Sequence, residues 1–405
     1  MKKHLLGGMA LLGIVGCSSS PSSSGSIGGA GPGPALSSPG SGTAPEPPLS
    51  SPGSGSAGVG GSGSGIGGGG ESAGAASGGD TAGAGSASSP GVSTGVGVEA
   101  PTTQGSAGVL TAGLWDDNLN YDFFGNYLAS HTAIAGDPGF VMSDYQTAHQ
   151  AFAQPASHTV VDAALVLDTT GSMGDELSYL TAEFANISNA IQAALPNAAQ
   201  RWALVVYRDT PDTDPGDAYV TKTFDFTANM QDFAATMGQQ TANNGGDYPE
   251  SPELGLEQLP QLAWRTGPSV ARVAFWVGDA PHHDQRGAAM KQAILDALAA
   301  NIRLYPVSAS GTNDLLELTM RSAAEITGGR YLFLTDDSGV GDPHKVPEIP
   351  CFFVTKLAKA LVRAVAIELS GSYSGPDPAD VIRTVGAPSS DGKCTTSDGQ
   401  TVQIF

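Results

Sequence analysis

One short segment limits the possible folds more than any other part of the chain. The apolar run Val160 to Leu167 has the length and composition of a strand buried on both faces. Asp168, Thr170 and Ser172 follow it directly, and an amphipathic helical pattern begins at about residue 175. Strand, short loop and helix form the repeating unit of an α/β fold. A carboxylate and two hydroxyls at alternate loop positions can converge on one hard cation, and such oxygen ligands suit Mg²⁺.

The alternation of strands and helices continues along the chain. Apolar residues from 177 to 195 recur at intervals of three and four, which predicts a helix. Strands are expected at 202–207, 219–226 and 270–277, and helices at 230–238, 250–262 and 288–300; the segments 302–307, 315–327, 331–334 and 354–369 continue the alternation. This pattern predicts a doubly wound, Rossmann-like α/β sandwich with a mostly parallel sheet. Ligands of such sheets bind beyond the carboxyl ends of the strands, where the strand order reverses.

Two later loops carry carboxylates in comparable places. Glu250 leads into a predicted helix, and Asp279 follows the predicted strand at 270–277. Each is a weak signal alone, because acidic residues at such positions often cap helices. Together with Asp168 they predict one metal site built from three loops.

The three loops resemble the metal-ion-dependent adhesion site of von Willebrand factor A domains, whose first loop has the pattern D-x-T-x-S. Residues 247–250 are similar in detail to the I-like domain of integrin β subunits, in which a glutamate replaces the threonine of the second loop. The resemblance covers about residues 160–369. It implies an Mg²⁺ or Mn²⁺ ion with five protein ligands: Thr170, Ser172 and Glu250 directly, and Asp168 and Asp279 mainly through water.

The same resemblance implies additional cation sites, which can hold Ca²⁺. Asp175 and Glu176 match the paired acids of integrin β domains, and Asp209 and Asp247 match ligands of a further site. The sequence departs from that pattern at Gly245, where the family has a ligating asparagine. This departure leaves the further site one ligand short.

Three histidines and two acids have more than one interpretation. His282 and His283 invite comparison with transition-metal sites, but no helix offers a second histidine four residues away. A place beside the oxygen ligands, or at the surface, is therefore favoured for both, and for His344. Asp116 and Asp117 favour a turn or a helix cap over a cation site.

The first 16 residues have the pattern of a secretory signal peptide: two lysines, then an apolar run, then a small residue before Cys17. Residues 14–17 resemble the lipobox of bacterial lipoproteins. This implies an acylated Cys17 and an extracytoplasmic place in the bacterial envelope, at the outer membrane or cell surface. The alternative is an ordinary signal peptide with an incidental cysteine. The apolar run of about 11 residues is shorter than the ~20 that a membrane-spanning helix needs.

Composition divides the rest of the chain. Residues 17–108 are mostly Gly, Ser, Ala and Pro, bury almost nothing and are predicted to be a disordered, lipid-anchored linker. Aromatic residues make 109–158 an expected extension that packs on the main domain at 159–371, and 372–405 form a C-terminal extension.

Cys351 and Cys394 allow two interpretations, a disulfide or two buried thiols. Disulfides persist in oxidising compartments, which the signal peptide predicts. Cys394 lies in a polar segment that has little else to hold it in place, so the disulfide is favoured.

Charge narrows the range of functions. The chain has 18 basic and 39 acidic residues, a net charge of −21, and no Lys or Arg between Lys3 and Arg201. This argues against a basic patch for nucleic acid. The leading expectation is a binding module, not an enzyme, whose cation is completed by an acidic residue of a protein partner that the sequence does not identify. The alternatives are a passive envelope or stalk protein with a structural ion and, less favoured, a metal-dependent hydrolase.

Overall fold

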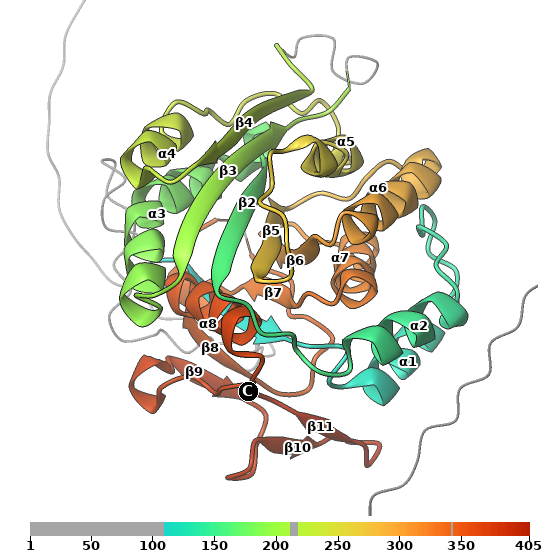
Figure 1. Ribbon diagram of the computed structural model, residues 1–405. Helices are drawn as coiled ribbons and strands as arrows, with labels where there is room; N and C mark the ends of the chain where they lie inside the picture. Colours follow the sequence, from blue (N-terminus) through green and yellow to red (C-terminus); the bar gives the residue numbers. More distant parts are fainter. Residues whose placement is uncertain (1–108, 211–217, 342) are drawn as a thin grey trace, which may run out of the picture. The chain divides into compact units, whose positions relative to one another are not determined.

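A nine-stranded sheet with the order β4-β3-β2-β5-β6-β7-β1-β8-β9 forms the centre of the protein (Figure 1). The structure is a computed structural model that describes residues 109–210, 218–341 and 343–405. The predicted signal peptide, the acylation of Cys17 and the linker at 17–108 therefore lie outside the described residues.

The sheet is parallel in its middle and antiparallel at both sides. Strands β2, β3, β5, β6 and β7 pair in parallel, whereas β4, β1, β8 and β9 pair antiparallel with their neighbours. From β2 the chain moves to β3 on one side and later to β5 on the other, so the strand order reverses at β2. The strands are β1 Thr111–Trp115, β2 Val160–Asp168, β3 Ala199–Tyr207, β4 Thr221–Thr227, β5 Val270–Gly278, β6 Arg303–Ser308, β7 Tyr331–Leu334, β8 Phe352–Lys356 and β9 Arg383–Val385.

Helices cover both faces of this sheet, as Figure 1 shows. Helices α3, α4 and α8 lie on one face, and α5, α6 and α7 lie on the other. The helices are α1 Tyr121–Ser130, α2 Met142–Phe152, α3 Gly174–Ala194, α4 Met230–Met237, α5 Pro252–Leu256, α6 Gly287–Ala299, α7 Asp314–Thr327 and α8 Leu357–Ser370. The predicted doubly wound α/β fold is confirmed.

Strand β2 explains why the sequence signal was strong. Ala164 and Val166 belong to the apolar core on the side of α5, α6 and α7. Leu165 and Leu167 belong to the core on the side of α3, α4 and α8. A strand buried on both faces needs apolar residues at successive positions, because alternate side chains enter different cores.

Two segments differ from the expected elements. The segment 354–369, expected as one element, divides into the end of β8 and helix α8. Aromatic and β-branched residues at 352–355 suit a strand that pairs with β1. The helix expected at 250–262 is reduced to α5 and a 3-10 turn at Leu259–Gln261, where Pro260 removes a backbone donor.

Residues 109–158 do more than pack against the main domain. Strand β1 enters the sheet between β7 and β8, and the helices α1 and α2 follow it. Asp116 accepts a hydrogen bond from Leu119 N at 2.7 Å, as in a turn. Its other oxygen lies 2.8 Å from Arg330 Nε. Asp117 forms an ion pair with Arg321 at 2.7 Å. The sequence analysis expected a turn or a helix cap for these two acids and did not predict their ion pairs.

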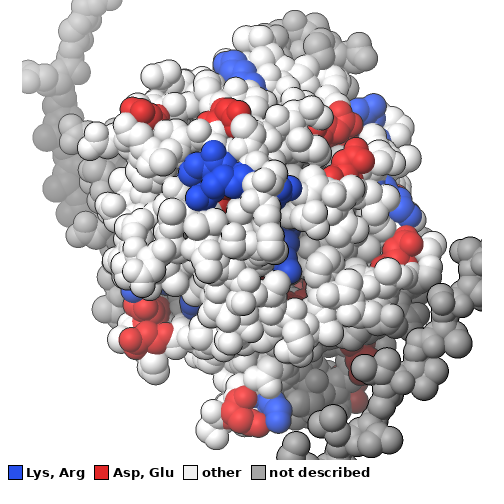
Figure 2. Space-filling view, viewed as in Figure 1, with Lys and Arg blue, Asp and Glu red and all other residues white. Residues whose placement is uncertain are grey.

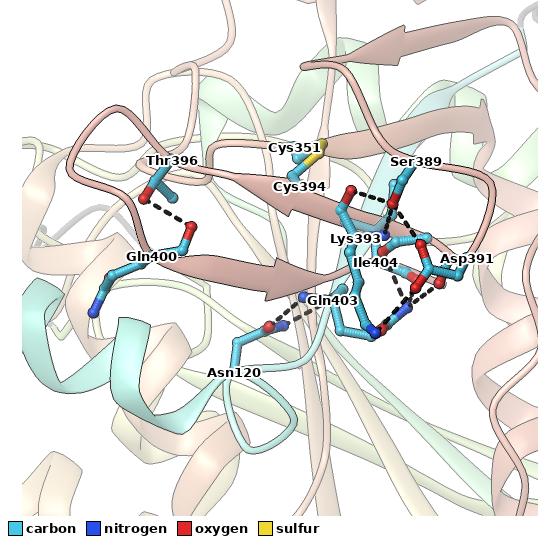
Figure 3. Close-up of a disulfide and its surroundings, with 11 residues drawn as sticks. Asn120, Cys351, Ser389, Asp391, Lys393, Cys394, Thr396, Gln400, Gln403 and Ile404 are labelled. Atoms are coloured by element: carbon cyan, nitrogen blue, oxygen red, sulfur yellow. Dashed lines mark hydrogen bonds and ion pairs between the residues drawn. A yellow bond between two sulfur atoms is a disulfide. The ribbon is translucent and has the colours of Figure 1, made fainter.

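The C-terminal extension is a small hairpin of β10 Lys393–Thr395 and β11 Thr401–Gln403. A disulfide joins Cys394 to Cys351, just before β8, which confirms that prediction (Figure 3). The hairpin also contacts the N-terminal part: Gln403 N donates to Asn120 Oδ1 at 2.7 Å, and Asn120 Nδ2 donates to Gln403 O at 3.0 Å.

Charged side chains are scattered over the face shown in Figure 2, where small groups of Lys and Arg alternate with small groups of Asp and Glu. In the described ranges, none of the helices has the length and apolar character required to cross a membrane.

Candidate metal centre

The three predicted loops meet at one edge of the sheet, at the carboxyl ends of β2 and β5. Asp168 is the last residue of β2, and Asp279 follows the last residue of β5. Backbone hydrogen bonds join the loops: Gly171 N donates to Asn244 O at 2.7 Å, and Glu250 N donates to Pro281 O at 2.8 Å. The loop before α5 is therefore held between the other two. This edge is where the strand order reverses.

The first loop brings its three oxygen-bearing side chains together. The backbone N–H and the hydroxyl of Thr170 both donate to Asp168 Oδ1, at 2.9 and 2.6 Å. A 3-10 turn at Gly171–Met173 places Ser172 Oγ 3.4 Å from Thr170 Oγ1. These contacts fix the carboxylate and the two hydroxyls in the arrangement that the D-x-T-x-S spacing predicts.

Glu250 reaches the first loop across Gly245. A Cβ at Gly245 would lie 2.6 Å from Glu250 Oε1 and 3.0 Å from Thr170 Cβ, so the glutamate and the threonine lie against the same backbone atoms. Gly245 has a φ of 113°, in the region that favours glycine. A side chain at this position would require Glu250 Oε1 to shift and would strain the backbone at this φ.

Burial makes two carboxylates of this centre, those of Asp168 and Asp279, resist ionisation. Burial raises the pKa of Asp168, although the hydrogen bonds from Thr170 oppose the shift. The pKa of Asp279 is raised to about 8, first by burial and then by the charge of Asp168. Asp168 Oδ2 and Asp279 Oδ1 are buried and accept no hydrogen bond. A divalent cation fits this donor set, because it would stabilise both charged forms and occupy the unsatisfied oxygens.

Tyr207 lies next to Asp168 in the sheet, and the sequence analysis did not identify it as part of the site. Tyr207 lies opposite Asp168 in the register of β2 and β3, and its hydroxyl accepts a hydrogen bond from Trp276 Nε1 at 3.1 Å. A Cβ at Gly278 would lie 2.5 Å from that hydroxyl and 3.6 Å from Asp168 Oδ2. Burial, followed by the charge of Asp168, raises the pKa of Tyr207 far above its ordinary value, so the phenol stays neutral. The sequence could have indicated this role, because Tyr207 is the last residue of β3 just as Asp168 is the last residue of β2.

The other predicted acids take two different places. Glu176 is fully buried and accepts a hydrogen bond from Ser310 N at 3.3 Å, whereas Asp175 is exposed. Asp209 and Asp247 come together with His283: one ligand atom from each lies within 4.8 Å of the others.

The Asp209–Asp247–His283 group is the sole one of its kind in the described parts of the chain. The carboxylates of Asp168, Glu250 and Asp279 do not form such a group, because their oxygens do not all lie within 4.8 Å of one another. The first centre therefore depends on the hydroxyls of its first loop as well as on its acids.

The surface position considered for the histidines is wrong. His283 is buried, and its Nε2 lies 2.9 Å from Asp209 Oδ1. His282 is also buried, with Nε2 2.8 Å from Gly136 O. His344 Nδ1 lies 3.0 Å from Asp336 Oδ1.

With the three loops in place, comparison with known proteins becomes informative. Residues 163–309 match the family model of the von Willebrand factor A domain. This match supports a von Willebrand factor A domain in the chain, and it includes all three loops of the candidate centre. The integrin-like detail and the lipoprotein anchor stay predictions.

One similar protein comes from Acanthamoeba polyphaga mimivirus and carries the description of an ariadne-like RING finger protein. It is 27% identical over 196 residues, which are 44% of this chain and 18% of that protein. The chain thus spans less than a fifth of that relative's length.

Proposed function

We propose that this chain is a metal-ion-dependent protein-binding module. Its cation, Mg²⁺ or Mn²⁺, would be held by the loops of the candidate centre and would keep one open position. An acidic side chain of a protein partner would complete the coordination. Hard divalent cations prefer such oxygen ligands, and Mg²⁺ commonly retains exchangeable positions. The five proposed protein ligands are Asp168, Thr170, Ser172, Glu250 and Asp279.

The observation that carries this proposal is the convergence of two neutral hydroxyls with buried, incompletely bonded carboxylates at one sheet edge. The hydroxyls add ligands without adding charge, which leaves a bound cation attractive to an outside carboxylate. The protein's own residues hold this arrangement: Thr170 donates to Asp168, Gly245 leaves room for Glu250, and Tyr207 lies beside Asp168 on the neighbouring strand.

Binding is favoured over catalysis. The sequence has no H-E-x-x-H pattern and no G-x-S-x-G nucleophile elbow. The Thr170 hydroxyl donates to Asp168 within the cluster, as expected of a positioned ligand. A metal-dependent hydrolase remains the weaker proposal.

For the location, we propose a lipid anchor at Cys17 and an extracytoplasmic domain at the bacterial outer membrane or cell surface. The lipobox-like residues 14–17 support the anchor. The disulfide between Cys351 and Cys394 supports an oxidising compartment. A flexible linker of roughly 90 residues would give the domain a reach of ~50 Å.

Capture of surface proteins tests the proposed function. The immobilised mature protein should retain a partner from surface extracts in Mg²⁺ and release it in EDTA. Asp168→Ala should lose this capture, whereas Thr241→Ala, an exposed residue of the second loop, should retain it. A partner retained equally in EDTA and by Asp168→Ala would instead support a passive stalk with a structural ion.

A further inference from the structure

A second set of ligating side chains lies beside the candidate centre and shares none of its five ligands. We propose that Asp209, Asp247 and His283 form a second cation site that prefers Zn²⁺, or a similar imidazole-binding transition ion, over Mg²⁺ and Ca²⁺. One ligand atom from each of the three lies within 4.8 Å of the others. This is close enough for one ion to contact all three after small side-chain adjustments.

Three separate loops supply the three ligands. Asp209 lies two residues beyond β3, Asp247 lies in the loop before α5, and His283 lies in the loop after β5. Asp209 and His283 are buried, while Asp247 is exposed. Two ligands are thus fixed in the protein, and the third lies where an ion can enter from solvent.

The buried pair is held in place before any ion binds. His283 Nε2 lies 2.9 Å from Asp209 Oδ1, and Ser251 Oγ donates to the same oxygen at 2.8 Å. A histidine–aspartate hydrogen bond explains the pair by itself, but it does not require a second carboxylate nearby. Asp247 adds that second carboxylate, and two like charges beside one imidazole are stabilised when a divalent cation lies between them.

The imidazole decides the class of ion. Carboxylates alone suit Mg²⁺ and Ca²⁺, whereas histidine nitrogen is a good ligand for Zn²⁺ and other transition ions. Two carboxylates balance the charge of a divalent ion, and water can complete the coordination on the exposed side of Asp247. In the metal-free protein the Asp209 carboxylate accepts the hydrogen bond from His283, so Nε2 carries the ring proton. When an ion binds, that proton would move to Nδ1, and Nε2 would offer its lone pair to the ion.

The site therefore differs from the one that the integrin-like resemblance implies. That pattern needs an asparagine at position 245, where this chain has a glycine and therefore no side-chain ligand. His283 supplies the missing third ligand from another loop, and it changes the site from all-oxygen to oxygen and nitrogen.

The neighbouring histidine provides a matched control. His282 is adjacent in sequence and also buried, but its Nε2 lies 2.8 Å from Gly136 O and it is outside the group of three. A histidine effect that is specific to the site must therefore be seen at His283 and not at His282.

Calorimetric titration of the mature protein with Zn²⁺, Mg²⁺ and Ca²⁺ tests the inference. It is done in the Asp168→Ala background, where the first centre cannot contribute. We expect one Zn²⁺ to bind per chain, more tightly than Mg²⁺ or Ca²⁺. His283→Asn should weaken Zn²⁺ binding at least about 100-fold, and His282→Asn should leave it unchanged. With Co²⁺ as the probe, His283→Asn should also lose the visible absorption of a bound ion.

Asp247→Asn is a second variant that should fold normally, because this residue is exposed and its substitution leaves the buried Asp209–His283 pair intact. It should weaken Zn²⁺ binding about tenfold or more without a change in melting temperature. Zn²⁺ binding that survives both Asp247→Asn and His283→Asn would overturn the proposal, as would its complete loss in Asp168→Ala alone. Failure of the partner-capture experiment would leave these results unaffected.

Discussion

Glu250 and Thr241 are the residues that separate the integrin-like second loop from an ordinary A-domain loop. A threonine is the usual ligand of that loop, and Thr241 was one of two nearby threonines in the sequence. The structure places Glu250 Oε1 near Thr170, across Gly245, whereas Thr241 is exposed. The Thr241 backbone has its own role, because its carbonyl accepts a hydrogen bond from Arg208 Nη2 at 2.7 Å.

We therefore predict that Glu250→Ala weakens Mg²⁺ binding far more than Thr241→Ala, by about 100-fold against less than threefold. Loss of a charged ligand explains the first effect, and the second variant keeps the backbone carbonyl. Calorimetry on both folded variants measures the difference. Equal losses, or the opposite order, would contradict Glu250 as a ligand.

The pKa values of the buried acids make metal binding depend on pH. Asp168 and Asp279 have raised pKa values in the metal-free fold, that of Asp279 about 8. Their ordinary values in an unfolded chain are about 3.9. The folded protein therefore binds these protons more tightly than the unfolded chain, and the resulting stability is lost as the pH rises from about 4 to 8. A cation replaces the lost protons.

We predict that the increase in melting temperature caused by Mg²⁺ is small at pH 5 and grows up to pH 8. Glu325, whose pKa is raised to about 9 mainly by burial, also affects stability in this range. Its effect is the same with and without Mg²⁺, so it cancels in the difference. Differential scanning calorimetry at several pH values measures the shift, with Asp168→Ala as the control that should show none. A shift that is constant with pH would rule out proton competition.

At the scale of elements, strands buried on both faces were predictable and short inserted strands were not. The expected segment 331–334 is strand β7, and 160–167 is all but the last residue of β2. The first is a continuous apolar run and the second is interrupted only by Asp162, which suits a strand covered on both faces. Strand β1 has only five residues, and its partners β7 and β8 lie more than 200 residues away. No local pattern reveals such a pairing.

The residues of the candidate sites also fall into a predictable and an unpredictable group. Asp168, Thr170 and Ser172 lie in one loop, so their spacing alone predicted their convergence. Tyr207 and His283 join the site through strand register and loop packing, which depend on the whole fold. The sequence shows that both residues are present, but it does not show which side chains they contact in the folded protein.

The disulfide links the C-terminal hairpin covalently to the main domain. It ties β10 to the segment before β8, near the side of the sheet farthest from the candidate centre. We predict that Cys351→Ser with Cys394→Ser lowers the free energy of unfolding by about 4 kcal/mol, because the closed loop is long. Mg²⁺ affinity should be unchanged. Urea unfolding and calorimetry test both statements, and a variant as stable as the wild type would show that the hairpin is held without the covalent link.

At the scale of the whole molecule, the proposed anchor and the proposed metal centre are separated by about 150 residues of sequence. The linker at 17–108 has no aromatic residues and few large apolar residues with which to contact the domain. Anchoring and metal binding should therefore be independent properties. The anchor would determine where the domain is, and the loops at the sheet edge would determine what it binds.

We accordingly predict that Cys17→Ala releases the protein from membranes while its Mg²⁺ affinity stays that of the wild type. A single acylated cysteine is the only membrane attachment that the sequence predicts, so its loss should leave the protein in the soluble fraction. Membrane fractionation locates the variant, and intact-mass measurement of the mature wild-type protein detects the lipid. Asp168→Ala is the reciprocal control: it should remain membrane-bound and lose Mg²⁺ binding. A wild-type mass without lipid on residue 17, or a Cys17→Ala protein that still sediments with membranes, would contradict the anchor.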